Sequence, residues 1–71
     1  MSSWPSTKAA RVFRALMRIG WKVKSGKGGS HRQLERQGWP NFTWAFHDND
    51  ELGPVMLKKI AKHTGLTPGD L

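Results

Sequence analysis

The stretch that decides the fold is "WKVKSGKGGSHRQLERQGWPNFTWAFH", residues 21–47. Its last part, residues 41–47, alternates large apolar side chains with small or polar ones. One side carries Phe42, Trp44 and Phe46, and the other carries Thr43, Ala45 and His47. A period of two residues is typical of a strand with one buried face and one open face. We therefore predict a strand that ends near His47.

Two further strands precede it. Residues 21–25 alternate between an apolar side and a lysine side, with Trp21, Val23 and Ser25 on the first. Residues 31–36 alternate in the same way, and place Leu34 opposite to a side with His31, Gln33 and Glu35. Glycine and proline mark turns after both segments, in "GKGG" and "QGWPN". Because short turns join antiparallel neighbours, we predict a three-stranded antiparallel sheet.

Helical spacing of apolar side chains flanks the strands on both sides. The first set is Ala9, Val12, Phe13, Leu16 and Met17, and the second is Met56, Leu57, Ile60 and Ala61. Ser6 or Thr7 is expected to cap the first helix, which ends at Gly20. Pro54 is expected to open the second helix and Gly65 to close it. A capped final turn is expected at residues 67–70, with Leu71 packing inward.

The predicted fold class is α+β, in the order helix, three strands, helix. Both helices would lie on one face of the sheet, over Trp21, Val23, Leu34, Phe42 and Trp44. The chain has 71 residues, which suits one domain over residues 1–71 with a flexible tail at 1–5. Cysteine is absent, and neither a membrane-spanning stretch nor a signal peptide is expected. We expect a soluble cytoplasmic protein without a membrane partner.

Charge is distributed unevenly along the chain. Lys and Arg number 12 against 5 Asp and Glu, for a formal net charge of +7. Residues 1–36 hold nine of the basic side chains and one acidic one, whereas residues 37–71 hold three basic and four acidic ones. A one-sided basic surface is typical of proteins that bind the phosphates of nucleic acids. A solvated surface, an acidic protein partner or an anionic membrane are the alternative interpretations.

The predicted open face of the sheet carries Lys22, Lys24, His31, Gln33, Thr43 and His47. Histidine exchanges a proton near neutral pH, and RNA carries its own nucleophile in the ribose 2′-hydroxyl. An imidazole beside a phosphate held by lysines therefore suits cleavage of RNA to a cyclic phosphate. The glycines just before His31 would let backbone N–H groups approach that phosphate. The alternative is an ordinary hairpin loop followed by a surface histidine.

Other candidate residues carry weaker signals. His47 is interpreted as a proton partner, a phosphate contact or a strand-end residue, and His63 as a residue that caps a helix end. Trp39, in a turn, is the best candidate for an exposed side chain that stacks on a base. The acidic cluster at residues 48–51 lacks the spacing of the common metal motifs, and "GKGGS" lacks the Walker spacing. No metal and no cofactor are therefore expected.

Several short motifs together resemble the HicA toxin family. They are Gly20-Trp21, Gly29-Ser30-His31, the strand end at His47, Glu51-Leu52, Pro54, Leu57, Ile60 and Gly65-Leu66. The resemblance covers about residues 7–71, and the combination is specific although each motif alone is weak. The chain departs from the family pattern at Ala45 and at Val55-Met56.

This resemblance implies a fold like that of double-stranded-RNA-binding domains and a toxin of a toxin–antitoxin system. It also implies mRNA cleavage (an mRNA interferase), translation arrest, neutralisation by a HicB-like antitoxin that masks the site, and His31 as the catalytic residue. We predict a metal-independent endoribonuclease with His31 as general acid or base. The expected RNA contacts are Lys22, Lys24, Lys27, Gly28, Gly29, Ser30, Arg32 and His47. The alternatives are a non-catalytic RNA-binding module and a basic protein-interaction domain.

Overall fold

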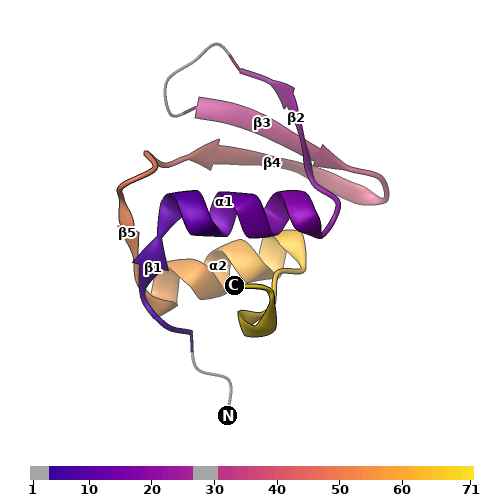
Figure 1. Ribbon diagram of the computed structural model, residues 1–71. Coiled ribbons are helices and arrows are strands. Elements are labelled where there is room, and N and C mark those ends of the chain that lie inside the picture. The colour runs from indigo at the N-terminus through magenta and orange to yellow at the C-terminus, as the bar shows by residue number, and fades with distance from the viewer. Residues whose placement is uncertain (1–3, 27–30) are drawn as a thin grey trace.

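The computed structural model describes residues 4–26 and 31–71. A sheet forms one layer, and two helices lie together on one side of it (Figure 1). The elements in chain order are β1 (Thr7–Lys8), α1 (Ala9–Arg18), β2 (Lys22–Ser25), β3 (His31–Arg36), β4 (Trp39–Ala45), β5 (Glu51–Leu52), α2 (Pro54–Thr64) and the 3-10 helix η1 (Pro68–Asp70). The predicted α+β fold is confirmed. Among these described elements, no helix has the length and apolar character needed to cross a membrane.

The main sheet has the order β2-β3-β4, and both of its strand pairs are antiparallel. In the middle of β3, Gln33 lies opposite Thr43, and Leu34 lies opposite Phe42. Directly opposed side chains share a face of the sheet. Leu34 is fully buried towards the helices while Thr43 is exposed, which confirms the alternation that the sequence predicted for β3 and β4.

Strand β2 departs from the predicted alternation. Its register against β3 shifts between Val23, which opposes Leu34, and Ser25, which opposes Gln33. An extra residue in one strand moves the following side chain to the other face, so Ser25 lies on the open face and its predicted placement is wrong. The prediction that the helices cover Val23 is also wrong. Val23 is 47% exposed, because β2 is an edge strand and the buried side chains of the sheet come from β3 and β4.

The core lies between the sheet and the helices. Its largest fully buried side chains are Val12, Leu16, Trp21, Leu34, Trp44, Leu57, Ile60 and Thr64. Aromatic rings interlock across the layers, with 5.6 Å between the centroids of Phe13 and Trp44. The indole N–H of Trp21 donates to the backbone oxygen of Thr64 at 3.0 Å. This bond joins the residue just before β2 to the end of α2 and satisfies a polar group that would otherwise be buried without a partner.

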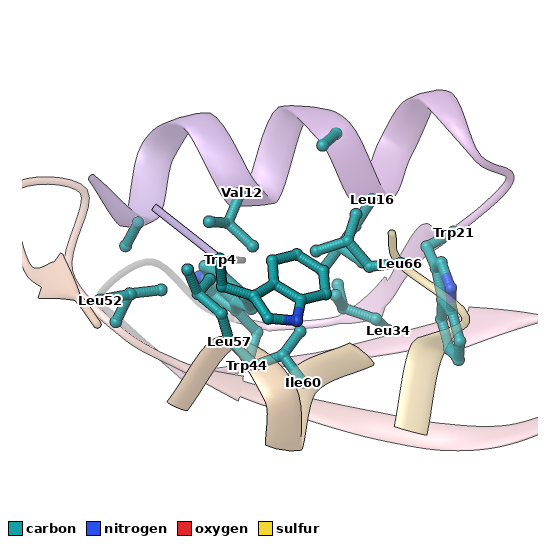
Figure 2. Packing of buried hydrophobic residues seen from close by; sticks show 12 residues of the cluster. Trp4, Val12, Leu16, Trp21, Leu34, Trp44, Leu52, Leu57, Ile60 and Leu66 are labelled. Atoms are coloured by element: carbon teal, nitrogen blue, oxygen red, sulfur yellow. The ribbon is translucent and has the colours of Figure 1, made fainter. Parts of the chain in front are cut away.

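The segment before α1 is also held in place. Trp4 is 8% exposed and belongs to the core, and Figure 2 shows its indole among the other buried side chains. Just after it, β1 pairs antiparallel with β5. The expectation of a flexible tail over residues 1–5 is therefore wrong at Trp4, whereas residues 1–3 lie outside the described part of the chain.

Helix α1 begins without a side-chain cap, so the predicted cap from residues 6–7 is wrong. The N–H of Ala9 donates to the backbone oxygen of Asp50 at 2.8 Å. The N–H of Ala10 donates to that of Asp48 at 3.1 Å. The first N–H groups of a helix need acceptors from outside the helix, and here the loop after β4 supplies them.

The predicted ends of α2 are confirmed. Pro54 is its first residue, and Gly65 after it has the left-handed conformation, with φ +77°. Thr67 and Asp70 form a capping box around η1, and Leu71 packs against the core. Met56 differs from the prediction, because it is 36% exposed instead of buried in the apolar stripe of α2.

Candidate nucleic-acid interface

His31 is the first residue of β3 and is exposed. It lies opposite Ala45 on β4, on the same face of the sheet as Gln33. The methyl group of Ala45 is a small cross-strand neighbour, so a large molecule on the open side of the sheet can reach the imidazole. The exposure expected for this ring is confirmed.

His31 is one of the residues that line a shallow hollow of about 230 Å³. The residues that line it are Ser25, Gly26, His31, Arg32, Gln33 and Thr43. Between two of these residues, the side-chain amide of Gln33 donates to the hydroxyl of Thr43 at 2.7 Å. Gln33 and Thr43 were placed on the open face by their alternation, whereas Ser25 was missed because the irregularity in β2 has no sequence signal. The hollow thus offers hydroxyl and amide groups beside an imidazole.

Gly26 explains part of the glycine content before His31. A Cβ at this position would lie 3.0 Å from Cγ of Arg32 and 3.2 Å from the backbone oxygen of His31. Both distances are shorter than ordinary van der Waals contact. The end of β2 therefore packs directly on the start of β3, and a larger residue at position 26 would push the two strands apart at the hollow.

Arg32 lies at the rim of the hollow but belongs to the covered face. It opposes the buried Trp44, and its guanidinium carbon lies 4.9 Å from the ring centroid of Phe13 in α1. A guanidinium at this distance from a ring is held by a cation–π interaction. Arg32 thus brings a fixed positive charge to the end of the sheet where His31 lies.

The lysines predicted to contact RNA do not gather at His31. Lys22 lies towards the other end of the sheet, opposite Glu35. It lines a larger hollow of about 490 Å³ together with Gly20, Glu35, Arg36, Gln37 and Asn41. Lys24 is exposed at the irregularity of β2. Among the described residues, His31 and Lys22 thus line separate hollows, and in the larger one Glu35 offsets part of the positive charge.

His47 lies two residues beyond Ala45, the residue opposite His31, and is exposed. Its backbone N–H donates to a carboxylate oxygen of Asp50 at 2.8 Å, and the N–H of Asp50 donates to the backbone oxygen of His47 at 3.0 Å. These bonds fix the loop that carries His47 at the same end of the sheet as His31. The predicted contacts Lys27, Gly28, Gly29 and Ser30 lie outside the described residues.

Trp39 and His63 have structural neighbours that the sequence did not reveal. Trp39 is 37% exposed, with the Arg36 guanidinium 5.4 Å and the Trp21 ring 6.1 Å from its own ring centroid. These contacts place Trp39 against the hairpin between β3 and β4. Its predicted exposure is confirmed, and stacking on a base stays a prediction. The ring of His63 stacks on Phe42, with 6.2 Å between centroids and 23° between planes.

Metal binding has no geometric basis among residues 4–26 and 31–71, where no three His, Cys, Asp or Glu side chains are grouped closely enough to hold an ion. Two acidic side chains of this segment have structural contacts. Asp50 accepts from the backbone of His47, and Glu51 lies 3.4 Å from the ammonium nitrogen of Lys8.

The fold and the site define a small basic α+β domain that presents a polar sheet face with an exposed histidine. The family model described as the HicA toxin of bacterial toxin–antitoxin systems matches residues 9–66. This range is well over half of the 71 residues, and the chain belongs to the HicA toxin family, as the sequence motifs suggested. No curated protein and no solved structure matches the chain. The likeness to double-stranded-RNA-binding domains stays a prediction.

Proposed function

We propose that the protein is a toxin that cleaves mRNA, with His31 as its proton-transfer residue. The observation that carries the proposal is an exposed imidazole at a hollow lined by hydroxyl and amide groups, on the uncovered face of the sheet. A packed core does not need this arrangement, because exposed polar groups add little to stability. Membership of a toxin family supports the proposal independently of the geometry.

The proposed chemistry uses the nucleophile that RNA already carries. The 2′ oxygen bonds to the neighbouring phosphorus, and the bond from phosphorus to the 5′ oxygen breaks. One proton leaves the 2′-hydroxyl and one reaches the 5′ oxygen, so the products are a cyclic phosphate and a free 5′-hydroxyl. His31 transfers one of these protons as general base or general acid. His47, at the same end of the sheet, has a supporting role in the second transfer or in holding the phosphate.

RNA would be held by charge and by hydrogen bonds along the open face. Arg32 lies at the His31 hollow, and Lys22 and Lys24 lie farther along β2. The proposal also includes Lys27 and the backbone of residues 28–30, which precede His31 in the chain. A positive charge near the phosphate stabilises the negative charge that develops as the 2′ oxygen attacks.

An mRNA substrate implies action in the cytoplasm, and a toxin of this family implies a neutralising partner. We assign that role to a HicB-like antitoxin that prevents RNA from reaching His31. The proposal requires no metal or cofactor, since nucleophile and proton carrier are both present once RNA is bound.

The test is incubation of the purified protein with labelled RNA in EDTA. Wild-type protein is expected to release fragments with cyclic phosphate ends, and His31→Ala to be slower by about 10²–10⁴-fold, the usual contribution of general acid–base catalysis. His63→Ala is the matched control, because His63 packs on Phe42 away from the hollow and should keep activity. Binding without cleavage by every variant would identify a non-catalytic RNA-binding module.

The same variants should differ in their effect on the growth of cells that express them. Induction of the wild type is expected to arrest growth, and induction of His31→Ala to leave growth unchanged. Affinity for RNA should fall with salt, with a log–log slope of roughly −0.7 for each phosphate neutralised on a single strand. A protein without measurable RNA affinity would instead fit the basic protein-interaction domain.

A further inference from the structure

A third hollow, of about 270 Å³, lies between β4 and α2. We call it the β4–α2 groove, and it is lined by Phe42, Thr43, Ala45, Phe46, Met56, Lys59, Ile60 and His63. Neither His31 nor any residue of β2 or β3 contributes to it. Its lining is largely apolar, and Met56 leaves 36% of its surface exposed there. An exposed apolar hollow of this kind is typical of a surface that binds another molecule.

The groove follows the outer edge of β4. Strand β4 is the last strand of the sheet order, and β3 is the strand that pairs with it in the described residues. Side chains from both faces of β4 line the groove, since Phe42 points to the helices and Thr43 to the open face. A strand edge of this kind presents backbone N–H and C=O groups to an added strand.

The charge around the groove selects the partner. Lys59 and His63 are its titratable lining residues, and no acidic side chain lines it among the described residues. Lys62 on the same helix is exposed as well. An added segment would therefore gain from acidic side chains, whereas a segment rich in lysine would be repelled.

We propose that the β4–α2 groove binds an extended, acidic segment of the antitoxin as a fourth strand on β4. Alternate apolar side chains of that segment would pack on Phe46 and Met56, and its carboxylates would meet Lys59 and His63. The existence of such a partner follows from membership of a toxin–antitoxin family. The position and chemistry of the contact come from the groove, and they go beyond the cleavage of RNA.

This position also explains how binding would inhibit the toxin. Neighbouring strands lie about 4.8 Å apart, so an added strand would lie roughly 10 Å from β3, the strand that carries His31. Ala45, which lies opposite His31, is itself a lining residue of the groove. A folded partner attached at this edge would stand beside the open face and exclude a long RNA from it.

The test compares two pairs of adjacent residues on α2. Met56→Glu and Lys59→Glu change the groove, whereas Val55→Glu and Lys58→Glu change exposed neighbours that do not line it. Each variant is titrated with the purified antitoxin, after circular dichroism has verified the fold. We expect about tenfold weaker binding or more for the groove variants, as for central contacts of an interface, and less than about twofold for the controls. Equal affinity for all four variants would overturn the proposal.

Hydrogen exchange supplies a second readout that needs no substitution. Addition of antitoxin is expected to protect outward-facing amides of residues 41–45, and protection confined to β2 would overturn the proposal. RNA cleavage by the free variants separates this proposal from the proposed function. Met56→Glu and Lys59→Glu should cleave RNA as the wild type does. A loss of cleavage with unchanged antitoxin affinity would assign the groove to RNA and reject the antitoxin segment.

Discussion

Gln33 and Leu34 are neighbours in β3, yet their surroundings differ completely. Leu34 is fully buried under the helices, whereas Gln33 lines the same hollow as His31. The covered face is held by interlocking rings, such as Trp44 against Phe13 and Trp44 against Phe46 at 5.0 Å. The open face has the side-chain hydrogen bond between Gln33 and Thr43.

In a domain of this size, the two faces of the sheet separate the residues that stabilise the fold from those that are available for function. A small domain buries a limited fraction of its surface, so it needs one continuous core. The covered face supplies it, and the open face is left to carry polar groups without a large cost in folding free energy. Substitutions on the two faces should therefore change different measurable quantities.

The largest expected effect compares adjacent residues of β4. Trp44→Ala should lower the free energy of unfolding by about 3–5 kcal/mol, the usual cost of removing a large buried side chain. Thr43→Ala, on the open face, should cost less than about 1 kcal/mol because its hydroxyl is exposed. Urea unfolding measures both values. Similar losses would contradict the separation of the two faces.

The next effect compares two glycines with positive φ. Gly65→Ala should lower stability by more than the roughly 1–2 kcal/mol of the left-handed conformation, because its Cβ would lie 2.9 Å from the Trp39 ring. Gly38 also has a positive φ, of +86°, but no atom lies within 4 Å of an added Cβ. Gly38→Ala therefore measures only the free energy cost of the left-handed backbone conformation. Thermal unfolding of both variants gives the difference. Equal shifts would show that Trp39 does not anchor the hairpin on α2.

A smaller effect concerns the buried hydroxyl of Thr64, which donates to the backbone oxygen of Ile60 at 2.7 Å and accepts from the N–H of Leu66 at 3.3 Å. Thr64→Val keeps the shape but removes both bonds, and should cost about 1–2 kcal/mol. Thr43→Val is the exposed counterpart, with an expected cost below about 0.5 kcal/mol, since water replaces its bond. Urea unfolding measures the loss of unfolding free energy in each variant. Equal losses would contradict the difference between the buried and the exposed hydroxyl.

The smallest effect is expected at the surface ion pair of Lys8 and Glu51, in the small β1–β5 sheet. The side chains are 60% and 56% exposed, with 3.4 Å between the charged atoms. Glu51→Gln should change stability by roughly 0.2–1 kcal/mol, as other exposed pairs do. The change should shrink in high salt, because dissolved ions screen exposed charges. A larger, salt-independent loss would mean that β1 and β5 depend on this pair.

Regular alternation made much of the site predictable. A period of two residues places His31, Gln33 and Thr43 on one face, and they lie together in the hollow. The same rule failed for Ser25, because an irregular strand pair shifts one residue without a marker in the chain. The β4–α2 groove was missed because its two walls come from segments that are separated in sequence, and Met56 was expected in the core.

The start of the chain shows the same limit. Nothing near Trp4 marks it as buried, and the pairing of β1 with β5 depends on a segment that follows β4 in the chain. The cap of α1 likewise comes from backbone oxygens of Asp48 and Asp50 instead of from a nearby side chain. Local patterns cannot show such contacts, because each partner has an ordinary sequence on its own.

Residue periodicity and short local motifs were enough to predict the α+β class, the three main strands, the two faces of β3 and β4, both ends of α2 and the family. Packing between distant segments decided that Trp4 joins the core, that Ser25 and Gly26 line a hollow with His31, and that an apolar groove lies between β4 and α2. The free energy of this packing depends on all the surfaces that meet.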